Sequence, residues 1–327
     1  MNKNPFRIDV HHHAVPREYT KALEKIGIHD ALGRPFPEWS AKKSLEVMDA
    51  NGIAAAVASI SSPGVYFGDR SAARDIARLC NELSAKMVSD HPSRFGAFAS
   101  LPLPDIDASL EEIARASGVL GLDGFVLLSN YEGAYIGDDS FEPVYAELDR
   151  RGAVVFLHPT DPQSGNPLGK EIPTFLMEVT FETTRVIFNL LYRGVLERFP
   201  NIRWIFAHAG GVLPYLTLRV SLGQFVLPDA AKAVPKGALH YLQKLYYDTG
   251  LSASPYVFRA LRELVEPAQI LFGSDYPFAP EIVTSETVKG LRAYDGFSAA
   301  DLERIERANA LDLFPRLKTL TVSANAT

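Results

Sequence analysis

The chain has 327 residues, of which 47% are hydrophobic and 22% are charged, a composition typical of an ordinary globular protein. The formal net charge of −6 gives no basic surface for nucleic acid, so a nucleic-acid partner is not expected. The single cysteine, Cys80, excludes a disulfide framework, and its helical surroundings predict a small buried residue. The first ten residues contain no apolar signal segment and no apolar run reaches membrane-spanning length. We therefore predict a cytoplasmic protein with no membrane contact.

Apolar, β-branched segments alternate with segments of helical period along the chain. Continuous apolar runs of this length are typical of strands that are buried on both faces of a parallel sheet. The eight predicted strands cover residues 6–12, 53–60, 94–101, 123–129, 153–158, 202–208, 245–250 and 269–275. Helical stretches separate them; one is expected to end at Gly52, and another to begin with Asp107 as its cap.

Eight strands with helices between them predict an α/β protein that folds as a (β/α)8 barrel. We expect a single domain over residues 1–327. Two stretches interrupt the alternation, namely residues 14–37 after the first strand and residues 159–172 after the fifth. Loops that follow the carboxyl ends of barrel strands build the active sites of this fold, so these two small insertions are expected to shape a pocket.

Four of the predicted strands end in side chains that can bind a metal or move a proton. These side chains are His11, His12 and His13 after strand one, His158 after strand five, His208 after strand six and Asp275 after strand eight. In a parallel barrel these strand ends meet at one rim, so we expect the side chains to lie close together. Alternation along the first strand lets His11 and His13 face the barrel axis and turns His12 toward the helix layer.

Imidazole nitrogens and a carboxylate oxygen bind divalent metals at about 2.0–2.2 Å. Three histidines and Asp275, with a position left for water or substrate, favour a catalytic site over a closed structural one. His208 is then a fifth group, either a ligand or a proton carrier. Taken singly, each histidine has an ordinary alternative as a hydrogen-bonded core residue, and Asp275 has one as a helix cap. Their common position at strand ends favours the metal site.

Four motifs at these strand ends carry a family resemblance. They are "IDVHHH", "FLHP", "FAHAGG" and "FGSDYP". The first resembles the Asp-x-His-x-His start of the amidohydrolase superfamily, and the others resemble its later metal-binding and catalytic strands. The similarity runs from residue 7 to about residue 315. It is closest to the decarboxylase branch, which includes decarboxylases of aminocarboxymuconate semialdehyde, γ-resorcylate, 5-carboxyvanillate and 6-methylsalicylate. Four further segments look most like the 6-methylsalicylate decarboxylases: "SSPGVYFGD", "RFGAFASLPLPD", "LDRRGAVVFLHPT" and "LYYDTGLSASP".

The resemblance implies one divalent metal ion per chain, Zn2+ or Mn2+. It implies as ligands His11, His13, His158 and Asp275, with His208 as the catalytic acid–base. Binuclear hydrolases of the superfamily usually carry a carboxylated lysine on the fourth strand. In this chain that strand ends "FVLLSNYEG", which has no lysine. Hydrolysis with two metal ions is therefore disfavoured.

The implied reaction is the non-oxidative decarboxylation of a hydroxybenzoate-like acid. The substrate carboxylate and an adjacent hydroxyl would bind the metal, which would stabilise the developing oxyanion, and Asp275 or His208 could protonate the ring carbon before CO2 leaves. A mononuclear hydrolase of a lactone or cyclic amide is the alternative, since the same metal can activate water. A metal-binding scaffold without activity is a third interpretation. It is disfavoured because a scaffold needs no open coordination position.

Two further residues are candidates for binding the substrate. Arg219, in "LPYLTLRV", has an ordinary interpretation as an exposed helix residue. In the decarboxylase branch, an arginine at the matching place reaches into the neighbouring subunit's site to hold a substrate carboxylate, a role that suits a bidentate guanidinium. This resemblance implies a homodimer or homotetramer. Phe278 could stack on a flat aromatic acid, as could Phe175, Phe181 or Tyr276, although packing is the commoner role for such rings.

Overall fold

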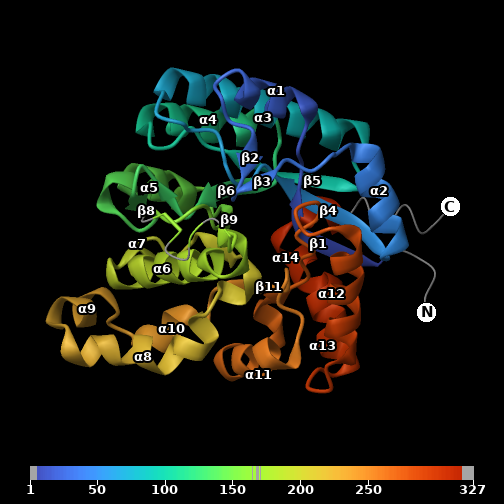
Figure 1. The fold of residues 1–327 in the computed structure, drawn as a ribbon. Helices are drawn as coiled ribbons and strands as arrows, with labels where there is room; N and C mark the ends of the chain where they lie inside the picture. Colours follow the sequence, from blue (N-terminus) through green and yellow to red (C-terminus); the bar gives the residue numbers. More distant parts are fainter. Residues whose placement is uncertain (1–5, 164, 167–168, 170, 319–327) are drawn as a thin grey trace.

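The computed structural model describes residues 6–163, 165–166, 169 and 171–318. Its centre is a sheet of eight strands paired in parallel with their neighbours, as a (β/α)8 barrel requires (Figure 1). In sheet order these strands are β1 (Arg7–His13), β4 (Ile53–Ser59), β5 (Phe95–Ser100), β6 (Gly124–Leu128), β9 (Val154–His158), β10 (Arg203–Phe206), β11 (Tyr246–Asp248) and β12 (Ile270–Leu271). The predicted fold is confirmed.

Backbone hydrogen bonds between the segment after β12 and β1 close the barrel. The Val10 N–H donates to the Phe272 carbonyl at 3.0 Å, and the His13 N–H donates to the Tyr276 carbonyl at 2.7 Å. The first and last strands therefore lie side by side, and the residues at their carboxyl ends become neighbours.

Helices surround the strands (Figure 1). The α-helices are α1 (Arg17–Glu24), α2 (Ala41–Ala50), α3 (Arg70–Asp90), α4 (Ile106–Gly118), α5 (Glu142–Arg150), α6 (Glu178–Tyr192), α7 (Val195–Arg198), α8 (Leu213–Val226), α9 (Pro228–Ala233), α10 (Ala238–Leu242), α11 (Pro255–Leu264), α12 (Glu281–Ala293), α13 (Ala299–Glu303) and α14 (Asn309–Leu313). Short 3-10 turns lie at Asp139–Phe141, Thr174–Leu176, His208–Gly210 and Pro267–Gln269, and a π turn lies at Arg304–Ala308. Within the described part of the chain, no helix combines the length and apolar character needed to cross a bilayer.

Helix ends follow the capping chemistry of the sequence, with one correction. The helix α2 ends just before Gly52, which has a φ of +65°, as predicted. The cap of α4 is Asp105, whose side chain accepts a hydrogen bond from the Ala108 N–H. The predicted cap, Asp107, lies instead in the first turn, where its charge complements the helix dipole.

The hydrophobic residues form two groups. One fills the barrel interior and includes Val10, Phe98 and Phe156, with Phe314 beside them. The other lies between the strands and the helices and includes Cys80, which is fully buried in α3, as expected. The polar side chains at the carboxyl ends of the strands therefore lie next to a packed apolar interior.

A β-bulge directs the histidines of β1. The pairing of β1 with β4 shifts register between Asp9 and His12. Val10 packs in the interior group, and the next residue, His11, also lies against an interior ring, with its ring centroid 4.9 Å from that of Phe156. His12 turns outward and contacts the Ser44 hydroxyl of α2 at 3.0 Å. The predicted orientation of His12 is confirmed. Alternation of side chains along the strand does not account for it alone, because the bulge also shifts the pairing of these residues.

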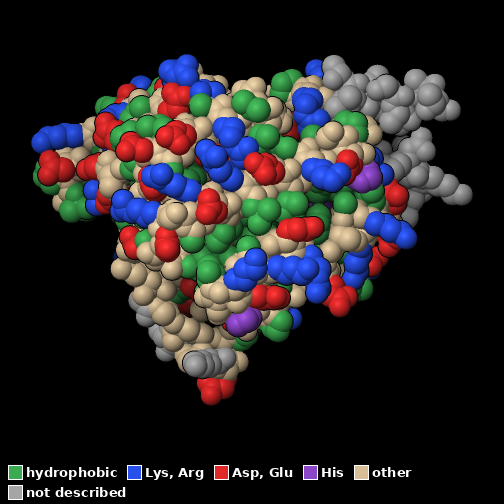
Figure 2. All heavy atoms as spheres, turned by 90° about the horizontal axis from the view of Figure 1, so that it is seen from above, with side chains coloured by type: hydrophobic (Ala, Val, Ile, Leu, Met, Phe, Trp, Pro, Cys, Tyr) green, Lys and Arg blue, Asp and Glu red, His purple; other side chains and the backbone are tan. Residues whose placement is uncertain are grey.

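The two insertions lie where they were predicted. Residues 14–37 contain α1 and a small hairpin of β2 (Asp30–Ala31) and β3 (Arg34–Pro35). Another hairpin, β7 (Asn130–Tyr131) with β8 (Ala134–Tyr135), follows β6. Of the second insertion, residues 164, 167–168 and 170 lie outside the described residues. Figure 2 views the molecule from above, and positive and negative side chains are intermixed on that face.

Candidate metal centre

Four side chains from the carboxyl ends of three strands converge at the barrel mouth. The possible ligand atoms of His11, His13, His158 and Asp275 all lie within 4.8 Å of one another, and all four residues are buried. The Nε2 atoms of His11 and His13 are 3.1 Å apart. Asp275 Oδ1 lies 3.1 Å from the first of these nitrogens and 2.9 Å from the second. Three ligand atoms thus surround one point, which is the geometry that a shared cation requires.

The other ring nitrogen of each histidine is already engaged. His11 Nδ1 lies 2.7 Å from Asp248 Oδ2, and His13 Nδ1 lies 2.9 Å from the Ser59 hydroxyl. His158 Nδ1 lies 2.7 Å from the Pro159 carbonyl, which can only accept a hydrogen bond. The Pro159 carbonyl requires the proton of His158 to be on Nδ1, and the Asp248 carboxylate favours the same in His11, whereas the Ser59 hydroxyl can either donate or accept. A ring with its proton on Nδ1 has Nε2 available as a ligand. The donor set therefore fits a divalent metal.

Burial and mutual charge perturb these groups strongly. Burial disfavours the charged form of His11, but Asp248 and Asp275 outweigh it and raise the pKa of His11 to about 10. Burial, reinforced by the neighbouring histidines, lowers the pKa of His13 to about 4 and holds that of His158 well below its usual range. Burial alone would raise the pKa of Asp275, but the adjacent His11 holds it well below its usual range. Such a cluster of perturbed groups is typical of a functional site.

The segment that carries Asp275 is tied to β1 by a second carboxylate. Asp9 accepts hydrogen bonds from the His11 N–H and from both the N–H and the hydroxyl of Ser274. Asp275 itself has a φ of +63°, which is strained for a residue with a side chain, and its N–H donates to the His11 carbonyl at 2.7 Å. The metal-binding ends of β1 and β12 are thus held as one unit. Strain of this kind persists where the surroundings over-determine it, commonly at functional sites.

His208 stands beside this cluster on an unusual turn after β10. It and Ala209 have φ values of +56° and +55°. A Cβ at Gly211 would lie 1.9 Å from the Thr180 carbonyl oxygen, so only glycine fits there. His208 Nε2 lies 3.4 Å from Asp275 Oδ2, and its buried Nδ1 has no hydrogen-bond partner among the described residues. The turn therefore presents the His208 ring to the oxygen of Asp275 that faces away from the other histidines.

A pocket of about 410 Å³ opens above these side chains. His158, His208 and Asp275 lie on its floor. Its walls are mostly apolar and come from the first insertion, from the segments around α6 and α12 and from Leu251 after β11: Ala31, Leu32, Pro35, Pro37, Phe175, Val179, Leu251, Pro277, Phe278, Ala279, Pro280 and Val283. None of the described residues of the second insertion, 159–172, lines this pocket, so the prediction that both insertions shape it is confirmed only for the first. Ser61, Ser62 and Arg34 add polar groups. The volume and lining suit a small, flat, largely apolar ligand with a few polar substituents.

The predicted substrate-binding residues fall in different places. Phe278 lines the pocket, and its ring centroid lies 5.5 Å from that of His13. Phe175 lines it too, whereas Tyr276 packs against His12 beneath it. Arg219 is exposed on α8 and does not line the pocket of its own chain. The metal ligands and His208 are thus brought together, and Arg219 is not among them.

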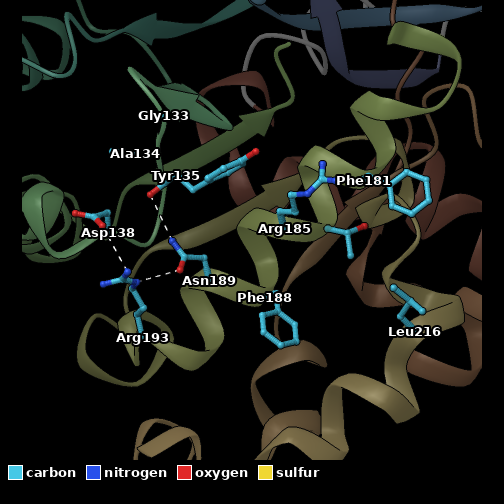
Figure 3. A pocket seen from close by; sticks show the side chains of 11 residues that line it. Gly133, Ala134, Tyr135, Asp138, Phe181, Arg185, Phe188, Asn189, Arg193 and Leu216 are labelled. Atoms are coloured by element: carbon cyan, nitrogen blue, oxygen red, sulfur yellow. Dashed lines mark hydrogen bonds and ion pairs between the residues drawn. The ribbon is translucent and has the colours of Figure 1, made fainter. Parts of the chain in front are cut away.

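A second cavity of about 480 Å³ lies outside the barrel mouth, between β8, α6 and α8 (Figure 3). Phe181 lines this cavity and not the metal pocket. Its cations are already paired with carboxylates, since Arg193 lies 3.6 Å from Asp138 and Arg185 lies 2.6 Å from Glu182. Because none of the metal-binding side chains or His208 lines it, we assign the chemistry to the barrel mouth.

The amidohydrolase family profile matches residues 8–316. The chain belongs to the amidohydrolase family. A 6-methylsalicylic acid decarboxylase from Penicillium expansum is 34% identical to this amidohydrolase over 316 residues, which cover 95% of this chain and 97% of that protein. Another from Aspergillus aculeatus is 36% identical over 333 residues, covering 95% and 97%. A γ-resorcylate decarboxylase from a Rhizobium species is 29% identical over 321 residues, covering 92% and 91%. These relatives place the amidohydrolase in the decarboxylase branch.

Solved structures share its architecture. An amidohydrolase II crystal structure, 29% identical, superposes with a TM-score of 0.88 over 94% of this chain and 99% of that one. A 5-carboxyvanillate decarboxylase from Novosphingobium aromaticivorans, complexed with manganese and 4-hydroxy-3-methoxy-5-nitrobenzoic acid, gives 0.85 at 20% identity over 96% and 97%. At that identity the second likeness concerns the fold alone.

Two residues near this site were not predicted from the sequence. Arg34 lies in an exposed hairpin, and its guanidinium stacks 4.9 Å from the Phe175 ring at the pocket wall. Asp248 ends β11, a short strand, and contacts His11 from inside the barrel. Its position at a strand end is the same signal that singled out His158 and Asp275.

Proposed function

We propose that this amidohydrolase is a metal-dependent, non-oxidative decarboxylase of a hydroxybenzoate-like acid, with 6-methylsalicylate as the first candidate substrate. One observation carries the proposal: a buried three-histidine, one-carboxylate cluster with His208 beside it reaches a small apolar pocket through His158, His208 and Asp275. Relatives that are 34% and 36% identical over nearly their whole length are 6-methylsalicylic acid decarboxylases, which supports the choice of substrate.

His11, His13, His158 and Asp275 would hold one divalent ion, Zn2+ or Mn2+. The ion supplies a Lewis acid for the oxygens of the substrate carboxylate and of an adjacent hydroxyl. Because the Nδ1 side of each histidine is engaged with a protein partner, the rings need no reorientation for this role. The same donors suit several divalent ions, so supply contributes to the choice of metal.

We assign proton transfer to the pair formed by His208 and Asp275. The ring carbon that bears the carboxylate must gain a proton before the carbon–carbon bond breaks, because CO2 would otherwise leave behind an unstabilised aryl anion. His208 Nε2 and Asp275 Oδ2 lie 3.4 Å apart and both residues line the pocket. A proton held between them is available to the ring. When CO2 leaves, the electrons of the broken bond restore the aromatic ring.

The pocket walls suit an aromatic acid. Phe278 and Phe175 provide ring surfaces, and the Arg34 guanidinium provides a positive charge for an anionic substituent. Apolar walls favour release of CO2 because the substrate loses charge at the reacting carbon when the carboxylate becomes a neutral gas. The Ser61 hydroxyl, which has no hydrogen-bond partner within the part of the chain that the structure describes, can serve a polar substituent of the ring.

The substrate-holding role of Arg219 requires a second copy of the chain. Around it, α8 exposes an apolar stripe of Tyr215, Leu218, Leu222 and Phe225, each between 49% and 87% exposed. Intervals of three, four and three residues place these side chains on one helix face, as in a helix–helix seam. A self-complementary stripe of this kind fits a two-fold homodimer. A homodimer is the smallest assembly in which Arg219 could reach a neighbouring site, and a homotetramer would also allow this contact.

Release of CO2 from an ortho-hydroxybenzoate tests the proposal against hydrolysis. The metal-containing protein should release CO2 from 6-methylsalicylate and leave a simple lactone intact. Lactone opening without CO2 release from 6-methylsalicylate or 2,6-dihydroxybenzoate would instead identify a mononuclear hydrolase.

A further inference from the structure

Asp248 is a buried carboxylate outside the proposed ligand set, and it contacts two of the residues that form the site. It is fully buried at the end of β11. Oδ2 lies 2.7 Å from His11 Nδ1. Oδ1 accepts hydrogen bonds from the His208 N–H at 3.0 Å and from the Gly250 N–H at 2.8 Å. A buried carboxylate is costly unless its oxygens are satisfied, and these three donors satisfy it.

We propose that Asp248 is a positioning residue that fixes His11 as an Nε2 metal ligand and anchors the backbone of His208. The proposal rests on the metal site proposed above but not on the identity of the reaction. One carboxylate would thereby set the relative placement of a metal ligand from β1 and a proton carrier from the turn after β10.

The surroundings leave the His11 ring little room for another orientation. A Cβ at Gly250 would lie 2.7 Å from His11 Nδ1, and one at Gly273 would lie 2.7 Å from His11 Cβ. Both glycines let the backbone approach the His11–Asp248 pair closely. The partner of Nδ1 in this closed space is Asp248, so the carboxylate decides which nitrogen carries the proton. With that proton on Nδ1, Nε2 presents its lone pair toward His13 and Asp275.

The anchoring of His208 follows from its backbone conformation. A φ of +56° is unfavourable for a residue with a side chain, and the next residue is also left-handed. Oδ1 of Asp248 accepts the N–H of this strained residue and the N–H of Gly250 together. Removing the oxygen would leave these two buried N–H groups without their acceptor, which should destabilise the turn that carries His208.

Asp248→Asn separates the two roles. Oδ1 receives two N–H groups and Oδ2 only one, so the asparagine oxygen will keep the Oδ1 position and its amide NH2 will face His11. Two donors then oppose each other unless the His11 proton moves to Nε2, where it blocks the metal. We expect the Zn2+ dissociation constant to rise about 10–100-fold. Asp248→Ala should weaken Zn2+ binding as well and should also lower the Tm below that of Asp248→Asn.

The measurement is a titration of the metal-stripped full-length protein with Zn2+ alone, in competition with a chromophoric chelator. Asp123→Asn is the matched control, because Asp123 is a buried carboxylate that accepts the Ala97 N–H and pairs with Arg316. That control should bind Zn2+ as tightly as the wild type. Wild-type Zn2+ affinity in a folded Asp248→Asn variant would overturn the proposal. Because no substrate is present, failure of the decarboxylase proposal would not affect this result.

A measurement on the unmodified protein covers the case in which Asp248→Asn does not fold. NMR of 15N-histidine-labelled, Zn2+-containing wild-type protein reports which nitrogen of each ring carries the proton. We expect His11 to be protonated at Nδ1 and bound through Nε2. Binding of His11 through Nδ1 would overturn the proposal.

Discussion

Asp275 Oδ2 lies 3.4 Å from His208 Nε2, while the other oxygen of the same carboxylate faces His11 and His13. One side chain therefore contacts both the metal-binding histidines and His208, the proposed proton carrier. Because the two oxygens of this carboxylate face different partners, Asp275 would fix the position of the metal relative to that of the transferred proton. Loss of Asp275 and loss of His208 should consequently have different effects.

His208→Gln should abolish most turnover while the protein keeps its metal. The variant removes a proton carrier, and loss of acid–base catalysis costs about 10²–10⁴-fold in kcat. Asp275→Asn should lose turnover and bind metal more weakly, because it removes a ligand as well. Metal content by elemental analysis and kcat by CO2 release distinguish the two variants. His240→Gln, on the partly exposed surface of α10, is the control. Retained turnover in both site variants would contradict the assignment.

Ser274→Ala should loosen the connection between β1 and the loop that carries Asp275. The Ser274 hydroxyl donates to Asp9, which also accepts the His11 N–H. Loss of this buried hydrogen bond should lower the free energy of unfolding by about 1–3 kcal/mol and weaken metal binding. Chemical denaturation and a Zn2+ titration measure the two effects.

The matched control for Ser274→Ala is Ser298→Ala. Ser298 also bonds an aspartate, Asp301, but does so as the cap of the exposed helix α13. Its replacement should cost about 1 kcal/mol of stability and leave Zn2+ affinity unchanged. Equal Zn2+ affinities for the two variants would show that the Ser274 contact has no role at the metal site.

Arg34→Ala should weaken substrate binding more than it slows the chemical step. Arg34 lies at the pocket wall, stacked on Phe175, and not with the metal ligands. We expect KM to rise about tenfold, equivalent to about 1.4 kcal/mol, with a smaller change in kcat. Arg17→Ala, on the exposed face of α1, should leave both constants unchanged. An unchanged KM for Arg34→Ala would remove this residue from the substrate site.

Charges placed in the α8 stripe should separate the subunits. Leu218→Asp combined with Leu222→Asp introduces carboxylates into an apolar face that would be buried in a dimer. Sedimentation should show a dimer or tetramer for the wild type and a monomer for the variant. The monomer should keep its metal but lose activity, because Arg219 could no longer reach a neighbouring site. Val119→Asp, exposed after α4, is the control. A fully active monomer would rule out the role of Arg219.

Cys80 should resist thiol reagents in the folded protein. It is fully buried in α3, and burial raises the pKa of its thiol. Because the thiolate is disfavoured only in the folded state, stability should decline as the pH rises above about 8.5, the ordinary thiol pKa. A chromogenic disulfide reagent at pH 8 should react slowly with native protein and with one thiol per chain after denaturation. Rapid reaction of the native protein would contradict the buried position.

The sequence was sufficient to predict the barrel and the convergence of its histidines. Buried strands leave clear apolar runs, and parallel topology brings His158 and Asp275 to one rim whatever their separation in the chain. The orientation of His11 and His13 was also predictable, although the β-bulge at Asp9–His12 was not. A bulge depends on how two strands pair and leaves no local signature.

Other features depend on contacts between distant segments. Asp105 and Asp107 are both able to cap α4, and only the path of the preceding turn selects the former. Arg34 became a pocket residue because a hairpin folds over the barrel mouth. Asp248 meets His11 across the barrel interior, 237 positions away in the chain. Arg219 lines neither of the two cavities described above, so its proposed role depends on assembly.

The most direct test of the central claim is CO2 release from 6-methylsalicylate by purified protein whose metal content has been measured. We predict about one divalent ion per chain and CO2 formation that stops when the ion is removed and resumes when it is returned. One ion per chain with no CO2 from either 6-methylsalicylate or 2,6-dihydroxybenzoate would contradict the decarboxylase assignment. No bound ion after reconstitution would contradict the metal site itself.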